Sequence, residues 1–231
     1  MEDKGYANPD LLMTPGQLHV RLQDASICIV DVRPTHEYVS GHIPGALHLD
    51  LYGISLNNTG REAFEAFMWT LAYLMGSRGI GSDATVVFYE NDSGMRAARG
   101  FWICEYLGHR DVHVLDGGLQ AWTAAGFETT VDVPIPEQAA FEIVTDTERH
   151  IGFEEIRDSL GQADFVPLDT RSDDEYYGRV ARSARGGAIP DAVHIEYLNN
   201  LDESGAFKPA AELREMYGRA GVTPEQTVAC Y

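Results

Sequence analysis

The fold of this protein is decided by the stretch GIGSDATVVFY, residues 79–89, which returns without a gap as GVTPEQTVACY at residues 221–231. Its apolar part, Thr85–Tyr89, is typical of a buried strand. A polar loop containing glycine follows at residues 90–96, and the second copy would reach the matching loop directly after Tyr231. The repeat predicts two copies of one domain.

The repeat extends upstream of this stretch. Strands are predicted at 27–33 and 165–171, and a Glu-Tyr pair follows each of them at the same offset. The motifs GHIPGALH at 41–48 and GAIPDAVH at 187–194 come next. A pair of apolar residues, spaced as on one helix face, precedes each strand at the same distance: Leu18 and Leu22, then Ile156 and Leu160.

Short apolar strands alternate with helical stretches downstream. Strands are predicted at 85–89 and 112–115, and helices at 95–107 and 119–125. This alternation predicts an α/β fold in which each domain is a mainly parallel sheet flanked by helices on both faces. The proline-containing, polar stretch 129–148 separates the copies. The predicted organisation is therefore a domain at 12–128, a linker at 129–148 and a second domain at 149–231.

Composition narrows the function classes. The chain has 17 basic and 36 acidic residues, a net charge of −19, which argues against nucleic acid or an anionic membrane as partner. No apolar run approaches the roughly 18 residues of a membrane span. The N-terminus shows no secretory signal, so we expect a cytoplasmic protein. Cys28, Cys104 and Cys230 lack metal-ligand spacing, and neither metal nor cofactor is expected.

The combined motifs resemble the rhodanese fold. They are DxRxxxEY, G(H/A)IPxA and a strand ending in tyrosine, and residues 114–122 match that family's terminal strand and turn. Two copies look like tandem thiosulfate sulfurtransferases, whose second copy usually carries the nucleophile. The resemblance implies a loop C-x-x-G-x-R directly after the strand. Amides around its cysteine would lower the thiol pKa and hold a persulfide, so that sulfur passes from thiosulfate to cyanide or a thiol.

The resemblance makes the first copy non-catalytic. Glu90 follows Tyr89 where the cysteine is expected, and Gly94 and Arg96 complete a loop one residue longer than the pattern. In the second copy the nucleophile is expected directly after Tyr231. We therefore expect the second domain to be truncated before its catalytic loop, the full-length protein to continue for about 35 residues, and the chain as given to be inactive.

Cys230 is a weak candidate for the nucleophile. It lies two residues before the expected position and aligns with Phe88 inside a strand. A mid-strand side chain there is expected to point into the core.

A basic insertion in the second copy is the predicted binding region for the substrate anion. It lies between Glu175 and the 187–194 motif and contains Arg179, Arg182 and Arg185. The insertion is either a solvated basic loop or a collector of anions at the mouth of the active site. The resemblance favours Arg185, which lies just before the motif.

Arg171 completes the candidate substrate-binding residues. An ion pair with Glu175 at the strand end is favoured over direct substrate contact, and Arg33 with Glu37 is the expected counterpart. Ala188 and Asp191 replace the usual histidine and glycine of the motif, and we interpret them as tolerated turn substitutions.

Three alternatives stay open. The donor is thiosulfate or 3-mercaptopyruvate, and the chain is alternatively a catalytically inactive rhodanese-like module used for binding or regulation. A related fold serves phosphatases with a longer C-x5-R loop. The residues after Tyr231 would distinguish these classes.

Overall fold

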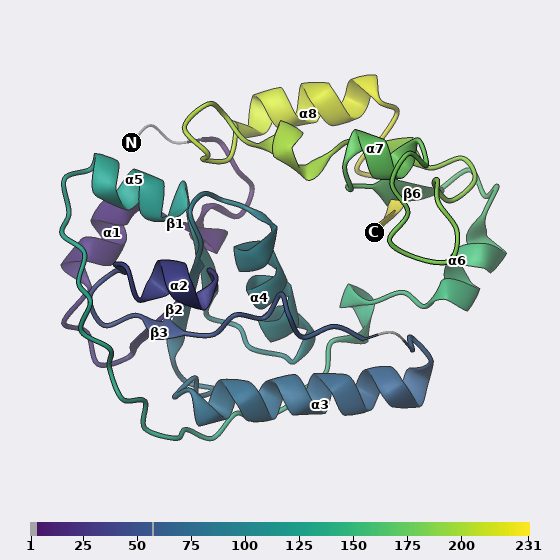
Figure 1. Ribbon diagram of the computed structural model, residues 1–231. Helices are drawn as coiled ribbons and strands as arrows, with labels where there is room; N and C mark the ends of the chain where they lie inside the picture. The colour runs from purple at the N-terminus through teal and green to yellow at the C-terminus, as the bar shows by residue number, and fades with distance from the viewer. Residues whose placement is uncertain (1–3, 57) are drawn as a thin grey trace. The chain divides into compact units, whose positions relative to one another are not determined.

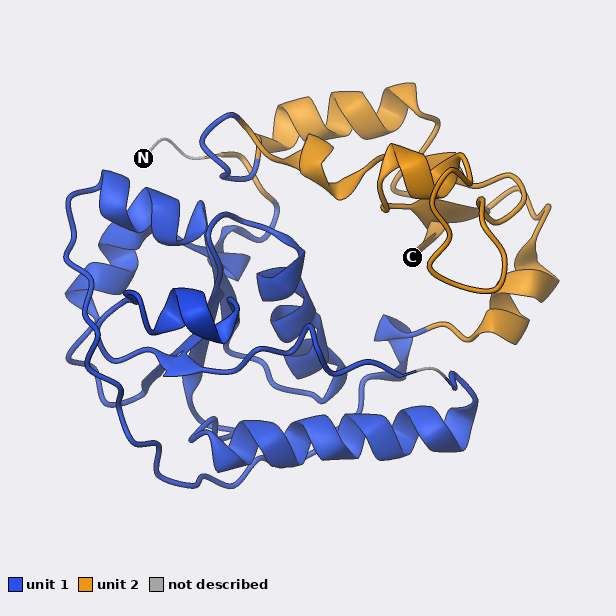
Figure 2. Cartoon of the chain, viewed as in Figure 1, with its two compact units in different colours: residues 1, 7–150, 203–207 blue, residues 2–6, 151–202, 208–231 orange. Residues whose placement is uncertain are grey.

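The computed structural model describes residues 4–56 and 58–231, which divide into two compact units (Figure 2). Within the described residues, unit 1 comprises 7–150 and 203–207. Unit 2 comprises residues 4–6, 151–202 and 208–231. Each unit is built around its own β-sheet.

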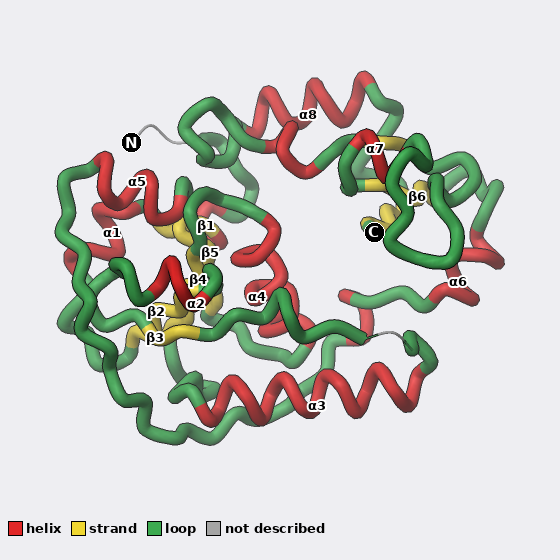
Figure 3. The backbone as a smooth tube through the Cα atoms, in the orientation of Figure 1, coloured by secondary structure: helices red, strands yellow, loops and turns green. Residues whose placement is uncertain are grey.

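Unit 1 contains a five-stranded sheet in the order β1-β5-β4-β2-β3 (Figures 1 and 3). All four of its ladders are parallel, as predicted. β4 lies at the centre, and β2 pairs with it so that Asp31 lies beside Tyr89. The strands are β1 Leu12–Met13, β2 Ile27–Asp31, β3 Leu47–His48, β4 Thr85–Tyr89 and β5 Val112–Leu115.

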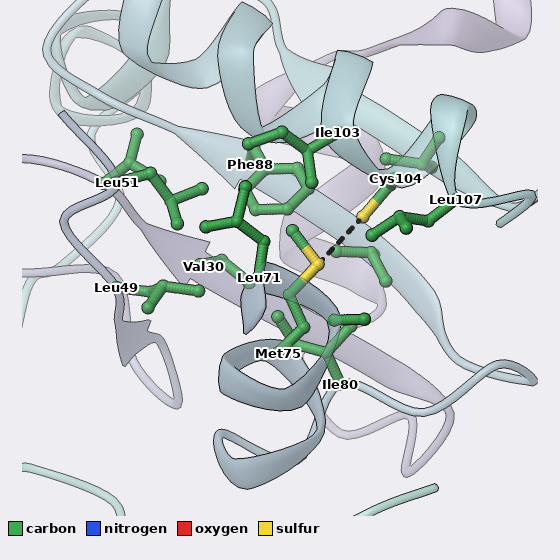
Figure 4. Packing of buried hydrophobic residues seen from close by; sticks show 14 of the residues in the cluster. Val30, Leu49, Leu51, Leu71, Met75, Ile80, Phe88, Ile103, Cys104 and Leu107 are labelled. Carbon is green, nitrogen blue, oxygen red and sulfur yellow. Dashed lines mark hydrogen bonds between the residues drawn. The ribbon is translucent and has the colours of Figure 1, made fainter. Parts of the chain in front are cut away.

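Helices cover both faces of this sheet. Alternate side chains of β4 therefore pack into two different cores. Val86 and Phe88 pack into the larger core, with residues of α3 and α4 (Figure 4). Val87 and Tyr89 pack into the other core, with Leu18 of α1 and Trp122 of α5. The helices are α1 Pro15–Val20, α2 Thr35–Tyr38, α3 Arg61–Ser77, α4 Met95–Tyr106 and α5 Gly118–Ala124, and short 3-10 turns lie at Pro9–Leu11 and Thr147–Arg149.

Helix α3 is the long element that the sequence analysis does not predict. Its buried face repeats at helical spacing through Phe64, Met68, Leu71 and Met75. In the second copy the matching region forms a shorter helix, α8 (Ala210–Arg219), with Ala210 as its buried residue. The repeat therefore gives little indication of α3.

Part of the predicted linker packs along unit 1. The Ala139 amide donates to the Gly76 carbonyl at 2.9 Å, and the Val144 amide donates to the Leu107 carbonyl at 2.9 Å. Gly108 has φ +88°, and a Cβ built on it would lie 2.1 Å from the Val144 oxygen. We call residues 136–146 the strap. The predicted domain boundaries stay a prediction.

Unit 2 has a three-stranded parallel sheet in the order β7-β6-β8. Its register matches unit 1, because Leu168 pairs with Cys230 as Val30 pairs with Phe88. The aligned sequences thus form the same strand pairing. The strands are β6 Phe165–Asp169, β7 Val193–His194 and β8 Thr227–Cys230, and the helices are α6 Phe153–Ser159, α7 Asp173–Tyr176, the 3-10 turn Tyr197–Asn200 and α8.

Replacing Asp191 with glycine is expected to stabilise the protein by about 0.5 kcal/mol. Asp191 has φ +60°, a left-handed conformation that the corresponding Gly45 adopts at +79°. Urea unfolding measures the gain. The matched variant Gly45→Ala, whose Cβ would meet open space, is expected to lose about 1 kcal/mol for conformational reasons alone. A loss of stability in Asp191→Gly would contradict this reading of the turn.

Candidate functional site

A buried polar network ties together the motifs at the carboxyl ends of β2 and β4. Arg33 donates from Nη2 to Asp31 Oδ2 at 2.6 Å and to the Gly41 carbonyl at 2.8 Å. The Tyr89 hydroxyl donates to Asp31 Oδ2 at 2.7 Å and accepts from the Ile43 amide at 3.1 Å. The DxR motif, the strand-ending tyrosine and the GHIP turn therefore form one hydrogen-bonded network.

Unit 2 contains the same hydrogen-bonded network. Arg171 Nε donates to Asp169 Oδ1 at 3.0 Å, and Nη2 donates to the Gly187 carbonyl at 2.9 Å. The Tyr231 hydroxyl accepts from the Ile189 amide at 2.8 Å. Burial alone raises the pKa of Asp169, but hydrogen bonds from Arg171 and Tyr231 outweigh it and hold that pKa below its usual value. The carboxylate therefore stabilises the fold at neutral pH, and this contribution is lost as acid protonates it.

The predicted ion pairs of these arginines are wrong. Arg33 and Arg171 each fold back onto the carboxylate two residues earlier, at the start of the DxR motif. Glu37 instead accepts from Asn91 Nδ2 at 2.6 Å, and Glu175 accepts from Arg182 Nε at 2.9 Å. The aspartate is the preferred partner because it and the arginine both lie at the end of the same strand, two residues apart.

The loop after β4 brings the predicted residues Glu90, Gly94 and Arg96 together. Glu90 Oε1 accepts from the Arg96 amide at 2.6 Å and from the Ala97 amide at 3.0 Å, in the first turn of α4. Burial raises the pKa of Glu90, and the two backbone hydrogen bonds oppose that rise. The N-terminus of a helix favours an anion. In unit 1 the protein's own carboxylate occupies that position.

The Arg96 side chain of this loop also contacts other residues of unit 1. Arg96 Nη1 lies 2.8 Å from Asp50 Oδ1, and its guanidinium lies over the Tyr52 ring at 4.3 Å. Gly94 is the N-cap of α4, and a Cβ there would lie 2.6 Å from Asp92 Oδ1. The loop is closed around its own carboxylate.

The basic insertion of unit 2 contains two paired arginines and one that differs. Arg179 Nη1 lies 2.5 Å from Asp174 Oδ1, and Arg182 pairs with Glu175 at 2.9 Å. Across the described parts of the chain, no carboxylate oxygen lies within 4.0 Å of the Arg185 guanidinium nitrogens. Of the three, Arg185 is the one whose charge the protein does not balance by an ion pair.

Cys230 is exposed, so the expectation that its side chain points into the core is wrong. Its counterpart Phe88 is fully buried against α4, where a Cβ on Gly100 would lie 2.6 Å from Phe88 Cδ1. β8 is an edge strand of the described sheet, and no matching helix covers it there. Partial desolvation nevertheless raises the pKa of the thiol. A nucleophilic cysteine needs the opposite shift.

Thiol labelling is expected to modify Cys230 alone in the folded protein. Cys28 and Cys104 are buried in the larger core, where Cys104 Sγ contacts Met75 Sδ at 3.6 Å (Figure 4). Burial raises the pKa of Cys28 to about 12 and raises that of Cys104 as well. Iodoacetamide labelling with mass spectrometry measures the sites. Rapid labelling of Cys28 or Cys104 without denaturant would contradict this packing.

The residues that the structure describes contain neither a metal-binding cluster nor a membrane-spanning helix. No group of three or more His, Cys, Asp or Glu side chains lies close enough together to hold a metal ion. Over the same residues, no helix has both the length and the apolar character needed to cross a bilayer.

Comparison with known proteins agrees with this geometry. The family described as the Rhodanese-like domain matches residues 14–125. A putative thiosulfate sulfurtransferase of Mycobacterium bovis is 33% identical over 236 residues, covering 97% of this chain and 78% of the relative. The chain belongs to the rhodanese-type sulfurtransferases. Sulfurtransferase function follows from this membership.

Other rhodanese-type sulfurtransferases share most of the chain. The thiosulfate sulfurtransferase of Pseudomonas aeruginosa is 29% identical over 223 residues, covering 96% of this chain and 82% of the relative. The fold resembles the structure of SseA from Escherichia coli, described among 3-mercaptopyruvate sulfotransferases. The TM-score is 0.81 at 20% identity, over 95% of this chain and 87% of that one.

The structure adds contacts that the sequence analysis does not predict. The hydroxyls of Tyr89 and Tyr231 bind the backbone of the IP turn, and Asn91 connects the loop to Glu37. The signal for the tyrosines is present in the sequence, because both copies end the strand in the same residue. Asn91 has no such signal, since its counterpart would lie beyond Tyr231.

Proposed function

We propose that the full-length protein transfers sulfane sulfur from thiosulfate to cyanide or a thiol, through a persulfide on a cysteine directly after Tyr231. The observation that carries this proposal is the position of Glu90 in unit 1. The side chain directly after the strand-ending tyrosine receives two amide hydrogens at a helix N-terminus. A cysteine at the same position of the second copy would have its thiolate and its persulfide stabilised in this way.

The proposed reaction has two steps. The thiolate attacks the outer sulfur of thiosulfate, the S–S bond breaks, and sulfite leaves with the bonding electrons. Cyanide then attacks the terminal sulfur of the persulfide, which releases thiocyanate and restores the thiolate. Arginines near the site would favour both the dianionic donor and the leaving sulfite.

We propose that unit 1 does not take part in the covalent steps. Glu90 stands where the cysteine is expected, and a carboxylate does not carry sulfane sulfur. Its buried oxygen already accepts from the Arg96 and Ala97 amides. We further propose a cytoplasmic location and a second rhodanese-like domain that the chain as given contains only in part.

Arg185→Ala is expected to raise the KM for thiosulfate about tenfold in the full-length protein, with a smaller effect on kcat. Loss of one charge-assisted contact of about 1.4 kcal/mol gives this factor. Thiocyanate release measures it. Arg182→Ala is the matched control, because Glu175 already neutralises that arginine. Equal KM values for the two variants would remove Arg185 from substrate binding, and Arg179 and Arg171 would then be tested in the same way.

3-Mercaptopyruvate is the second candidate donor, since the similar fold from Escherichia coli is described with that substrate. Parallel assays of the full-length protein with each donor, at fixed cyanide, distinguish the two by kcat/KM. No sulfur transfer from either donor in a folded, reduced sample would instead favour the binding or regulatory module.

A further inference from the structure

A pocket of about 170 Å³ lies within unit 1, between helix α3 and the strap. The Ala139 amide donates to the Gly76 carbonyl at 2.9 Å, and a Cβ built on Gly76 would lie 2.8 Å from the Ala139 oxygen. The strap therefore lies directly on the helix backbone and forms one wall of the pocket. The residues that matter below are Trp69 and Tyr73 of α3, and Gln138, Phe141 and Ile143 of the strap.

Two aromatic side chains of α3 are exposed at this pocket. Trp69 is 63% exposed and Tyr73 is 60% exposed. Their rings are stacked, with centroids 6.2 Å apart and planes 12° from parallel. The two residues are four positions apart, so they lie on the same side of the helix. Exposed aromatic rings that gather around a pocket, rather than lying singly, are typical of a binding surface.

The electrostatic surroundings of the pocket are acidic, although the side chains that line it are uncharged. Glu137 precedes Gln138 in the strap, and Glu142 lies between Phe141 and Ile143; both glutamates are exposed. In the described part of the chain, no Lys, Arg or His nitrogen lies within 4.0 Å of either carboxylate. The whole chain has a net charge of −19. The field at this pocket therefore favours a cation.

The combination of stacked rings, apolar walls and flanking carboxylates matches an arginine side chain. A guanidinium is planar and stacks on aromatic faces, and the aliphatic stem of arginine can lie against Phe141 and Ile143. A carboxylate beside the pocket can accept hydrogen bonds from the same group. A lysine ammonium is more strongly hydrated and cannot stack. A wholly apolar side chain would gain nothing from the carboxylates.

We propose that the pocket between α3 and the strap binds an arginine side chain from a basic segment of another protein. The guanidinium would lie against Trp69 and Tyr73, and Glu137 and Glu142 would supply the balancing charge. All of these residues belong to unit 1. This role goes beyond sulfur transfer and does not depend on the nucleophile or on the identity of the donor.

Titration with a peptide of alternating arginine and glycine, at about 0.15 M salt, tests the proposal. The readout is the indole N–H signal of each tryptophan in a two-dimensional ¹⁵N NMR spectrum. The Trp69 signal is expected to shift and to saturate. The indole N–H of Trp102 donates to the Arg149 carbonyl at 2.8 Å. That of Trp122 donates to the Glu128 carbonyl at 2.9 Å. Both of these signals are expected to stay in place.

The same peptide with citrulline in place of arginine is the control for charge. Citrulline has nearly the shape of arginine without its positive charge, so the Trp69 signal is expected to stay in place. An equal shift with both peptides would overturn the proposal, because the pocket would then not select a cation.

Trp69→Ala is expected to weaken binding of the fluorescently labelled arginine peptide about fivefold, measured by anisotropy. Glu142→Gln is expected to weaken it about threefold. Phe153→Ala is the matched control, since Phe153 is 58% exposed in unit 2 and does not line the pocket. Its affinity is expected to equal that of the unmodified protein. Equal affinities of Trp69→Ala and Phe153→Ala, or equal shifts of all three indole signals, would show only general attraction to an acidic surface and would overturn the proposal.

Discussion

Replacing Asp31 with alanine is expected to lower the free energy of unfolding by about 3 to 5 kcal/mol, because it leaves a buried guanidinium without its carboxylate. The side chains of Arg33 and Asp31 are 5% and 0% exposed. Asp31 also accepts from the Arg33 amide and the Tyr89 hydroxyl. One substitution therefore removes the acceptor that holds β2, β4 and the turn together. Urea unfolding measures the loss.

Asp169→Ala is the matched variant, since it breaks the same hydrogen-bonded network in unit 2. There the Arg171 side chain is 32% exposed, so water replaces part of what the carboxylate supplied. The expected loss is about 1 to 3 kcal/mol. Asp31→Asn keeps an acceptor oxygen and is expected to fall between the two. Equal losses in Asp31→Ala and Asp169→Ala would show that burial of the arginine does not set the energy of this network.

Gly108→Ala is expected to lower the free energy of unfolding by about 3 kcal/mol and to release the strap. The left-handed backbone costs a Cβ about 1 to 2 kcal/mol. That Cβ would also lie 2.1 Å from the Val144 oxygen, so the strap must move. Its amides at Val144 and Asp146 then lose their bonds to the carbonyls of Leu107 and Tyr106, at about 1 kcal/mol each. Urea unfolding and limited proteolysis measure the two effects.

Gly126→Ala is the control for the cost of placing a Cβ on left-handed backbone. Gly126 follows α5 as Gly108 follows α4, with φ +81° and nothing within 4 Å of its Cβ. Its expected loss is about 1 kcal/mol, with no new proteolysis at 136–146. The strap would have no stabilising role if the two variants lost equal stability and were cleaved alike.

The sheet of unit 1 was predictable because its strands leave a clear pattern. A strand buried on both faces is apolar throughout, as at 85–89, and its ungapped counterpart in the second copy forms the same strand pairing. Helix α3 was missed since its second-copy counterpart is shorter and differently buried. The strap was missed because its contacts are made by backbone atoms, which proline and polar residues do not reveal.

The candidate site was predictable in position more than in contacts. Spacing placed Glu90 directly after the strand 85–89, but chain distance does not say which acid an arginine reaches. Arg33 has both Asp31 and Glu37 within its range, and only the folded strand end selects Asp31. Cys230 was misjudged because burial depends on the elements that pack over a strand as well as on its own alternation.

The two compact units are not continuous in sequence, so a single cut after the strap does not yield them. A fragment ending at His150 would leave the Ser93 amide without the Gly205 carbonyl, and a fragment starting at Ile151 would leave the Ala210 amide without the Lys4 carbonyl. Each fragment would lack a short segment that belongs to its own unit, which is residues 203–207 for unit 1 and residues 4–6 for unit 2.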